Sequence, residues 1–194
     1  MIQSAIERKS ATSDRITLCA QALTDERGLD GFTMDELATA AEVSRRTLFN
    51  YFPGKIDAVL GLWPGFDEAD IEAFRSGGPS QDLVRDLRTL VVPLLQTEMM
   101  SREIVARARR IMVANARLIA QCHERYLHLS AEIVEHIAVR EGPAFAALRA
   151  RVAISLLGAL FDAALDDYLL DPEERPILFH FDESLRTARS LLGS

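Results

Sequence analysis

Apolar residues recur along the chain at the three- and four-residue spacing of amphipathic helices, and the period-two alternation of strands is absent from the sequence. In residues 14–27, four side chains fall on one helical face: Ile16, Cys19, Ala20 and Leu23. Gly28 follows at the position where a C′ glycine ends a helix. Similar spacings continue through most of the sequence, so we predict an all-α protein.

Two short helices joined by a short turn are predicted next. Thr33 and Glu36 have the spacing of a capping box, in which the two side chains accept hydrogen bonds from free backbone amides of the first turn. The helix that begins there directs four residues inward: Met34, Leu37, Ala38 and Ala41. Ser44 caps a second helix, Pro53-Gly54 ends it, and a further helix begins near Lys55.

Longer helices are predicted beyond residue 60. Trp63-Pro64-Gly65 interrupts the pattern, and residues 77–80 (Gly-Gly-Pro-Ser) form the clearest linker in the sequence. Helical stretches are then expected over 81–98, 102–113, 115–140 and 143–170, with Ser101 and Asn115 as N-caps and Gly142 as a stop signal. We expect Asp182 to cap the last amphipathic helix.

The last two predicted helices carry more apolar surface than one buried face needs. A helix that is apolar nearly all round must be covered on all sides. We therefore expect these helices to form a four-helix interface between two copies of the chain. The predicted interface residues are Leu156, Leu157, Leu160, Phe161, Leu185, Ala188 and Leu192.

Composition indicates a soluble globular protein. The chain has 194 residues, of which 48% are hydrophobic and 26% charged, and these are ordinary proportions. The polar start, Met1–Arg15, predicts no signal peptide, and the apolar run Val152–Phe161 is too short to span a bilayer. Cys19 and Cys122 match no metal or redox spacing. We expect a cytoplasmic protein with reduced thiols.

Charge limits the way in which nucleic acid could be bound. The formal net charge is −7, which argues against coating of nucleic acid by bulk charge. Residues 1–60 contain seven basic and nine acidic residues. Any DNA affinity must therefore come from where individual charges are placed, and its dependence on salt should be shallow.

The helix after Ser44 has the layout of the recognition helix of a helix-turn-helix motif, which enters the major groove. Four apolar residues are spaced to pack inward: Val43, Leu48, Phe49 and Phe52. The outward side chains include arginines, which suit guanine, and an asparagine, which suits adenine. Tyrosine, lysine and backbone amides at a helix start suit phosphate. The predicted DNA-binding residues are Thr33, Ser44, Arg45, Arg46, Thr47, Asn50, Tyr51 and Lys55.

Two of these assignments have alternatives. Arg45 and Arg46 could form a solvated helix end. Tyr51 could be a half-buried core residue with an exposed hydroxyl.

The stretch of sequence that contains the predicted helix-turn-helix motif resembles the N-terminal DNA-binding domain of the TetR family of transcriptional regulators. The resemblance rests on Phe32–Ala38, on Val43–Phe49 and on the specific run Tyr51–Lys55. It implies a homodimer that binds a palindromic operator, usually represses, and is released by a small molecule. It also implies a DNA-binding domain over residues 1–55 and an effector-binding and dimerisation domain over 56–194. Glu42 departs from the pattern, because many relatives have glycine at this turn position.

The second domain carries weaker signals. A pocket for an apolar effector could be lined by Phe66, Phe74, Met99, Met100 and Met112, although such residues more often form core. A basic stretch contains Arg102, Arg107, Arg109, Arg110 and Arg117. We interpret it as a solvated face paired with acids such as Glu98 and Glu103, and the alternative is an anionic effector site.

No enzyme or metal site is predicted. Around Cys122, only Glu124 and His128 share a helical face, so a third metal ligand is missing. His180 near Asp182 is unremarkable, and no catalytic constellation or cofactor motif is evident. The rival to a regulator is a helical module that binds a ligand or a protein without sequence-specific DNA binding.

Overall fold

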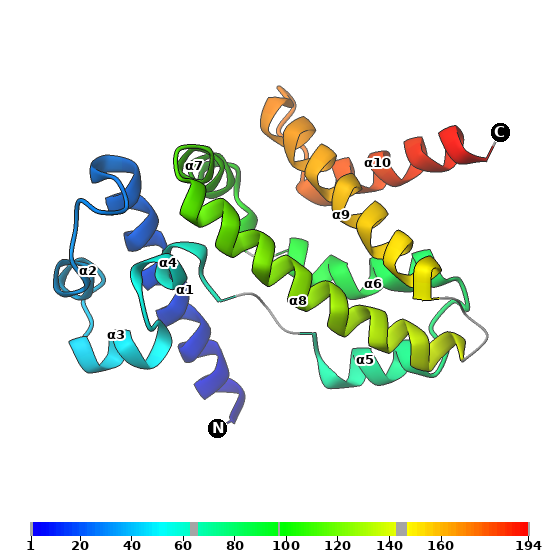
Figure 1. Cartoon of the computed structure of the whole chain (residues 1–194), viewed down its shortest axis with the longest axis horizontal. Coiled ribbons are helices and arrows are strands. Elements are labelled where there is room, and N and C mark those ends of the chain that lie inside the picture. The colour runs from blue at the N-terminus through cyan, green and yellow to red at the C-terminus, as the bar shows by residue number, and fades with distance from the viewer. Residues whose placement is uncertain (1, 63–65, 97, 143–146, 194) are drawn as a thin grey trace. The chain divides into compact units, whose positions relative to one another are not determined.

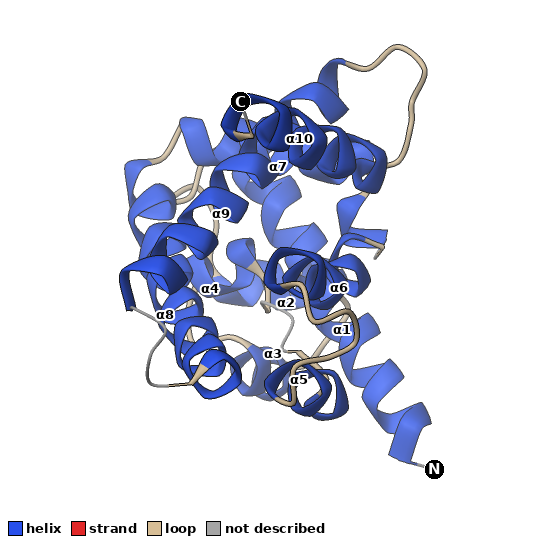
Figure 2. Ribbon diagram, turned by 90° about the vertical axis from the view of Figure 1, so that its right-hand side faces the viewer, coloured by secondary structure: helices blue, strands red, loops and turns tan. Residues whose placement is uncertain are grey.

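The computed structural model describes residues 2–62, 66–96, 98–142 and 147–193, and every regular element in this part of the chain is a helix (Figure 2). The chain divides into two compact units, each built from two separate stretches of sequence. The elements are α1 (Ile2–Arg27), α2 (Met34–Ala40), α3 (Arg45–Tyr51), α4 (Lys55–Leu60), α5 (Glu68–Arg75), α6 (Leu83–Leu95), the 3-10 helix η1 (Glu98–Met100), α7 (Arg102–Val113), α8 (Ala116–Glu141), α9 (Ala147–Leu170) and α10 (Ile177–Leu192). The all-α prediction is confirmed.

The first unit consists of Met1–Pro64 and Glu103–Arg125. Helix α1 packs on α2 and α4, and α2 packs on α3 (Figure 1). The core includes the predicted inward face of α1 and residues from α7 and α8. Its buried members include Ile16, Ala20, Leu37, Leu48, Phe52, Val59, Ile111 and Leu118. The helix-turn-helix core is therefore continuous with the α7–α8 corner, and this compact unit extends beyond residues 1–55.

The second unit consists of Gly65–Arg102 and Tyr126–Ser194, and its most extensive helix pair is α9 with α10. A buried ion pair holds the segment between α5 and α6. Arg140 Nη2 lies 2.7 Å from Asp86 Oδ2, and the two side chains are 3% and 0% exposed. The other Asp86 oxygen accepts hydrogen bonds from the backbone amide and hydroxyl of Ser80, at 2.9 and 2.6 Å. The predicted linker at 77–80 thus separates two helices but is tied to the core of this unit.

A second buried polar cluster lies at the turn between α9 and α10. Asp171 is 5% exposed, and its carboxylate accepts hydrogen bonds from the Arg175 side chain at 2.8 and 2.9 Å. These bonds lower the pKa of Asp171. The Nε2 atom of His180, which is also buried, lies 3.1 Å from the same carboxylate. His180, unremarkable in the sequence, is therefore a core residue with a specific polar partner.

Several predicted boundaries need correction. Helix α1 begins at Ile2, well before residue 14, and α6 ends at Leu95, three residues before the predicted end. Helix α10 begins at Ile177, after Pro176. Asp182 is therefore not a cap but an interior residue whose carboxylate binds Arg88. The predicted break at Trp63-Pro64-Gly65 and residues 143–146 lie outside the described residues.

The glycines predicted to end two helices lie directly after those helices. Gly28 and Gly142 follow α1 and α8 with φ values of 75° and 77°, as expected for glycines that end helices. Among the described helices, none is long and apolar enough to cross a membrane.

Candidate nucleic-acid interface

The α2–α3 pair is fixed by side-chain caps at both helix starts. The Thr33 hydroxyl accepts a hydrogen bond from the Glu36 amide at 3.2 Å, and the Glu36 carboxylate accepts one from the Thr33 amide at 2.7 Å. The predicted capping box is present. The Ser44 hydroxyl likewise accepts a hydrogen bond from the Thr47 amide at 3.0 Å and lies 2.8 Å from the Thr47 hydroxyl. Thr33 thus fixes the first turn of α2, and Ser44 with Thr47 fixes the first turn of α3.

The exposed face of α3 carries Arg45, Arg46 and Asn50. The Arg45 side chain is 68% exposed, and its Nη1 lies 3.3 Å from Asp35 Oδ2 on α2. Its guanidinium also lies 5.5 Å from the centre of the Phe49 ring. Arg46 forms no ion pair with any residue in the described part of the chain. The arginine forks and the asparagine amide are therefore presented outward, as readers of base edges must be.

Phe49 does not pack inward as predicted. It is 43% exposed, whereas Leu48 and Phe52 beside it are 0% and 1% exposed. Because α3 is only seven residues long, its contact with the core is narrow, and Leu48 with Phe52 fills it. Phe49 is therefore a further candidate for base contact, since an exposed aromatic ring can pack against a thymine methyl group. Its position in the helical repeat alone could not separate the two environments.

The side chains of Tyr51 and Lys55 make contacts with the rest of the first unit. Tyr51 is half-buried and packs against the core of the first unit. The Lys55 ammonium donates a hydrogen bond to the Phe32 carbonyl at 2.9 Å and lies 5.1 Å from the Phe32 ring centre. For Lys55, the structure thus adds a structural role, namely fixing the start of α4 to the segment that precedes α2.

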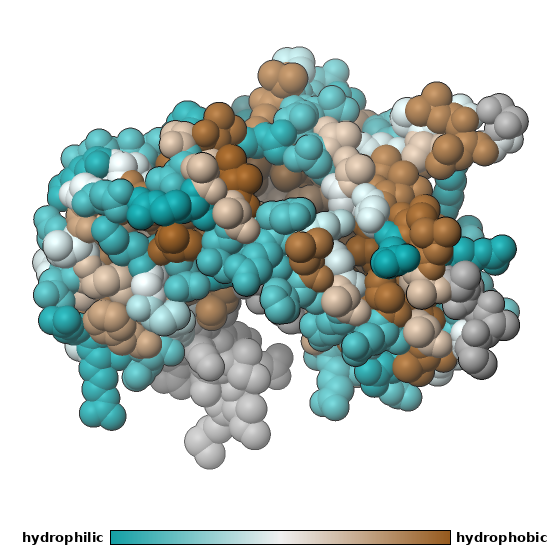
Figure 3. Space-filling model, in the orientation of Figure 1, coloured by the Kyte–Doolittle hydropathy of each residue, from teal (hydrophilic) through white to brown (hydrophobic). Residues whose placement is uncertain are grey.

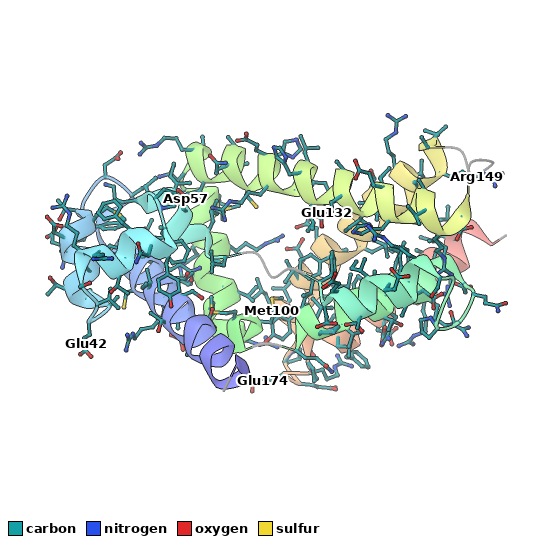
Figure 4. All side chains as sticks on the ribbon, turned by 90° about the horizontal axis from the view of Figure 1, so that it is seen from below. Glu42, Asp57, Met100, Glu132, Arg149 and Glu174 are labelled. Atoms are coloured by element: carbon teal, nitrogen blue, oxygen red, sulfur yellow. The ribbon has the colours of Figure 1, made fainter. Side chains whose placement is uncertain are left out.

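Glu42 occupies the turn between α2 and α3 and points outward (Figure 4). Its φ of 51° lies in the left-handed region, which glycine adopts more readily than other residues. Non-glycine residues are strained there because Cβ approaches the following carbonyl oxygen.

Three arginines from the α7–α8 corner bind carboxylates of the helix-turn-helix part within the first unit. Arg110 Nη2 lies 2.7 Å from Asp25 Oδ2, and Arg117 Nη2 lies 2.5 Å from Asp30 Oδ2. Each guanidinium lowers the pKa of its aspartate. We call these two pairs, with the contacts of Arg125 described next, the arginine clamp.

Arg125 makes two contacts with α4 and the residue that follows it. Its Nη2 lies 2.8 Å from Asp57 Oδ1, and its Nη1 donates to the Gly61 carbonyl at 2.7 Å. Asp57 is labelled in Figure 4. Because the carbonyls at a helix end lack intrahelical partners, the second contact completes the end of α4.

The basic stretch is mostly paired, but with other partners than expected. Arg107 lies 2.8 Å from Glu103, as predicted. Arg110 and Arg117 bind Asp25 and Asp30 instead, far away in sequence. Arg102 donates to the Leu169 carbonyl at 3.1 Å in the second unit. The side chain of Glu98 is outside the described set.

The residues proposed for an effector pocket have different surroundings. Phe74 is 1% exposed and lies beneath the Arg140 guanidinium, 4.9 Å from it. Phe66, Met99 and Met100 are half-buried in the second unit. Met112 packs against the core of the first unit. Four of the five therefore belong to one unit, and the core interpretation describes Phe74 and Met112 well.

The predicted interface residues on α9 and α10 are partly used within the chain. Leu157 and Leu185 are buried, and the Phe161 ring packs edge-on against Phe181 at 6.5 Å. Leu160 and Ala188 are half-buried. Leu156 and Leu192 are 36% and 72% exposed. Apolar surface lies over α9 and near the end of α10 (Figure 3).

The described residues contain no group of three His, Cys, Asp or Glu side chains that could hold a metal ion. Glu124 and His128 are exposed on α8. Burial raises the pKa of both the Cys19 and the Cys122 thiol, which disfavours thiolate chemistry at either position.

Comparison with known proteins finds a family model that matches part of the first unit. Residues 17–58 match the family model of bacterial regulatory proteins of the tetR family. Among solved structures, the chain is similar to a candidate TetR-family transcriptional regulator from Mesorhizobium loti MAFF303099, with 18% identity and a TM-score of 0.49 over 95% of this chain and 98% of that one. No curated protein sequence matches significantly. The matched segment contains the capped α2–α3 pair, so residues 17–58 are similar to the DNA-binding domain of tetR-family regulatory proteins.

Proposed function

We propose that the protein is a repressor that binds a palindromic operator as a homodimer and leaves it when a small-molecule effector binds. The observation that carries the proposal is the exposed polar face of α3, whose first turn is capped by Ser44. Among the described residues of the first unit, the ion pair that this face forms is Arg45–Asp35, so duplex DNA is the partner that its chemistry fits.

On DNA, we assign base reading to Arg45, Arg46 and Asn50, with Phe49 against a thymine methyl group. Arginine presents a fork to guanine O6 and N7, and asparagine pairs with adenine in a similar way. Thr33, Ser44, Thr47, Tyr51 and Lys55 are assigned to the backbone, through the helix starts that they cap or fix.

Homodimerisation is supported by apolar residues that the single chain leaves exposed on α9. Leu148, Val152 and Leu156 follow one another at four-residue spacing and are 62%, 55% and 36% exposed. Residues at this spacing line one face of a helix. A second copy that covered this face through a two-fold axis would place two α3 helices on symmetric half-sites.

Effector release requires a route from the second unit to α3. Helix α8 contributes residues up to Arg125 to the first unit and residues from Tyr126 onward to the second. We assign this helix the role of transmitter, with Arg125 as its contact to α4. An effector that binds one arrangement of α8 more tightly would shift the population toward a state with wrongly placed reading helices.

In vitro selection from random duplex DNA tests the proposal. The full chain is purified, its oligomeric state is measured, and bound duplexes are sequenced after several rounds. Enrichment of one palindrome is the expected result. Failure of folded, dimeric protein to enrich any sequence would contradict the proposal and favour the helical binding module. Repression is then tested with a reporter gene behind the selected operator, where higher expression in the presence of the protein would indicate an activator instead.

A further inference from the structure

A groove of about 410 Å³ lies between α6 and α10 in the second unit, and arginines dominate its lining. Arg85 and Arg88 come from α6, and Arg186 and Arg189 come from α10. Asp182 is the single carboxylate among the lining residues, and Leu185 contributes apolar surface. This concentration of positive charge runs against the net charge of −7 for the whole chain.

Two of the four arginines are already held by carboxylates. Arg88 binds Asp182 through two contacts, with Nε 2.5 Å from Oδ1 and Nη2 2.7 Å from Oδ2. Because this bidentate pair joins α6 to α10, it fixes the two walls of the groove relative to each other. Arg186 pairs with Glu183 along α10.

The remaining two arginines, Arg85 and Arg189, are the unneutralised charges of the groove. Both are exposed, and neither forms an ion pair with another residue in the described part of the chain. They belong to opposite walls, one on α6 and one on α10. An anion between them could accept hydrogen bonds from both guanidinium groups, whose planar forks suit a carboxylate.

The apolar part of the lining restricts the ligand further. Leu185 is 8% exposed, and Val84 lines the groove beside it. An aliphatic chain attached to the anionic group would contact these side chains. We propose that this groove binds a small organic carboxylate with a short aliphatic chain, held by Arg85 and Arg189.

The groove shares one residue, Leu185, with the predicted dimer interface. The exposed face of Leu148, Val152 and Leu156 lies on α9, and none of these three residues lines the groove. None of the residues assigned to DNA lines the groove. Binding of the carboxylate can therefore be tested without DNA, and its outcome is independent of whether the protein is a repressor.

Isothermal titration calorimetry with sodium octanoate on the full chain tests the proposal. Octanoate should bind, and both 1-octanol, which lacks the charge, and acetate, which lacks the chain, should bind at least about tenfold more weakly. The double variant Arg85→Gln/Arg189→Gln should bind octanoate at least about tenfold more weakly. A tenfold change in affinity is about what the loss of one modest charged hydrogen bond produces. Both residues are exposed, so the variant should fold.

The matched control is Arg151→Gln, which removes an exposed arginine of the same unit outside the groove. It should bind octanoate as the unchanged chain does. Three results would each overturn the proposal: no octanoate binding by the unchanged chain, equal affinity in the double variant, or an equal loss in Arg151→Gln. The second of these would place octanoate elsewhere in the molecule.

Discussion

At the scale of single residues, the candidate DNA-binding face contains one arginine that is restrained by neighbouring side chains and one that is not. Arg45 is oriented by Asp35 and by the Phe49 ring, whereas Arg46, next to it, has neither restraint. An ordered arginine loses less conformational entropy when it binds a base. Arg45 is therefore suited to a fixed contact with a base, and the Arg46 side chain can adjust to the major groove of the DNA.

Arg46→Ala tests whether this free arginine reads a base. We expect specific binding to the selected operator to weaken by about 1–3 kcal/mol, the value of one good bidentate contact. Affinity is measured by fluorescence anisotropy at fixed salt, with random duplex as competitor. Arg151→Ala, in the second unit, is the charge-matched control and should bind normally. Unchanged operator affinity in Arg46→Ala would remove this residue from the interface.

Glu42→Gly tests the strained turn between α2 and α3. A residue other than glycine costs about 1 kcal/mol at the φ of 51° found here. Glycine should therefore raise the stability of the chain by up to about 1 kcal/mol, or about 2–4 °C in Tm. The operator sequence should stay the same, since Glu42 is not among the assigned readers. A lower Tm in thermal unfolding would show that the strain argument is wrong.

At the scale of elements, Arg125 of α8 joins this helix to α4 through polar contacts with Asp57 and Gly61. Arg125 is 22% exposed and Asp57 is 32% exposed, so their interaction is less screened than that of a surface pair. A double-mutant cycle with Arg125→Ala and Asp57→Ala should give a coupling energy of about 1 kcal/mol. Arg125→Ala alone should cost more, about 1–2 kcal/mol, because the Gly61 carbonyl also loses its donor.

The exposed pair Arg107–Glu103 supplies the control for this cycle. These residues are one helical turn apart, and Glu103 is 82% exposed, so their coupling should be only about 0.3–0.5 kcal/mol. Urea unfolding measures both cycles. Equal coupling in the two pairs would mean that Arg125 is an ordinary surface contact and not a link between helices.

His136 makes the stability of the second unit depend on pH. It is 8% exposed, and its Nδ1 accepts hydrogen bonds from Arg75 Nε and Nη2 at 3.3 and 3.0 Å. Burial, followed by the Arg75 charge, lowers the pKa of His136. The folded state then binds a proton less readily than the unfolded chain, so this stability is present above about pH 6.5 and is lost as the pH falls below it.

His136→Gln tests this dependence, since glutamine can still accept from Arg75 but does not titrate. Urea unfolding at pH 7.5 and 5.5 should show a smaller loss of stability in this variant than in the unchanged chain. His123→Gln, which replaces an exposed histidine of the same helix, should keep the full loss. Identical pH dependence in all three proteins would exclude His136 as the source.

The features that could be predicted from sequence are those whose partners lie within one helical turn. The capping box of Thr33 and Glu36, the Ser44 cap and the glycine after α1 each depend on neighbours a few residues away. Asp182 is an interior residue of α10, and its partner, Arg88, is 94 positions distant and so outside any local sequence pattern. The arginine clamp was missed for the same reason. Phe49 was misplaced because periodicity cannot show how wide a contact a seven-residue helix makes.

At the scale of the whole molecule, the proposed mechanism requires two copies of the chain. A single α3 helix presents a few readers and reads only a short half-site, so specificity for one operator depends on a second copy at a fixed distance. The exposed face of Leu148, Val152 and Leu156 on α9 is where we expect the copies to meet. Burial of these three side chains would add a favourable hydrophobic contribution to dimer formation.

Val152→Glu tests this surface, because a carboxylate at the centre of an apolar interface would be buried without a partner. Val152 is 55% exposed in the single chain, so the variant should fold normally by circular dichroism. Sedimentation velocity should show a monomer at concentrations where the unchanged chain is a dimer, and affinity for the palindrome should fall with it. Val139→Glu, with the same substitution at a 63% exposed valine on α8 of the same unit, should remain dimeric. A dimeric Val152→Glu protein would place the interface elsewhere, and a monomeric unchanged chain would contradict the homodimer itself.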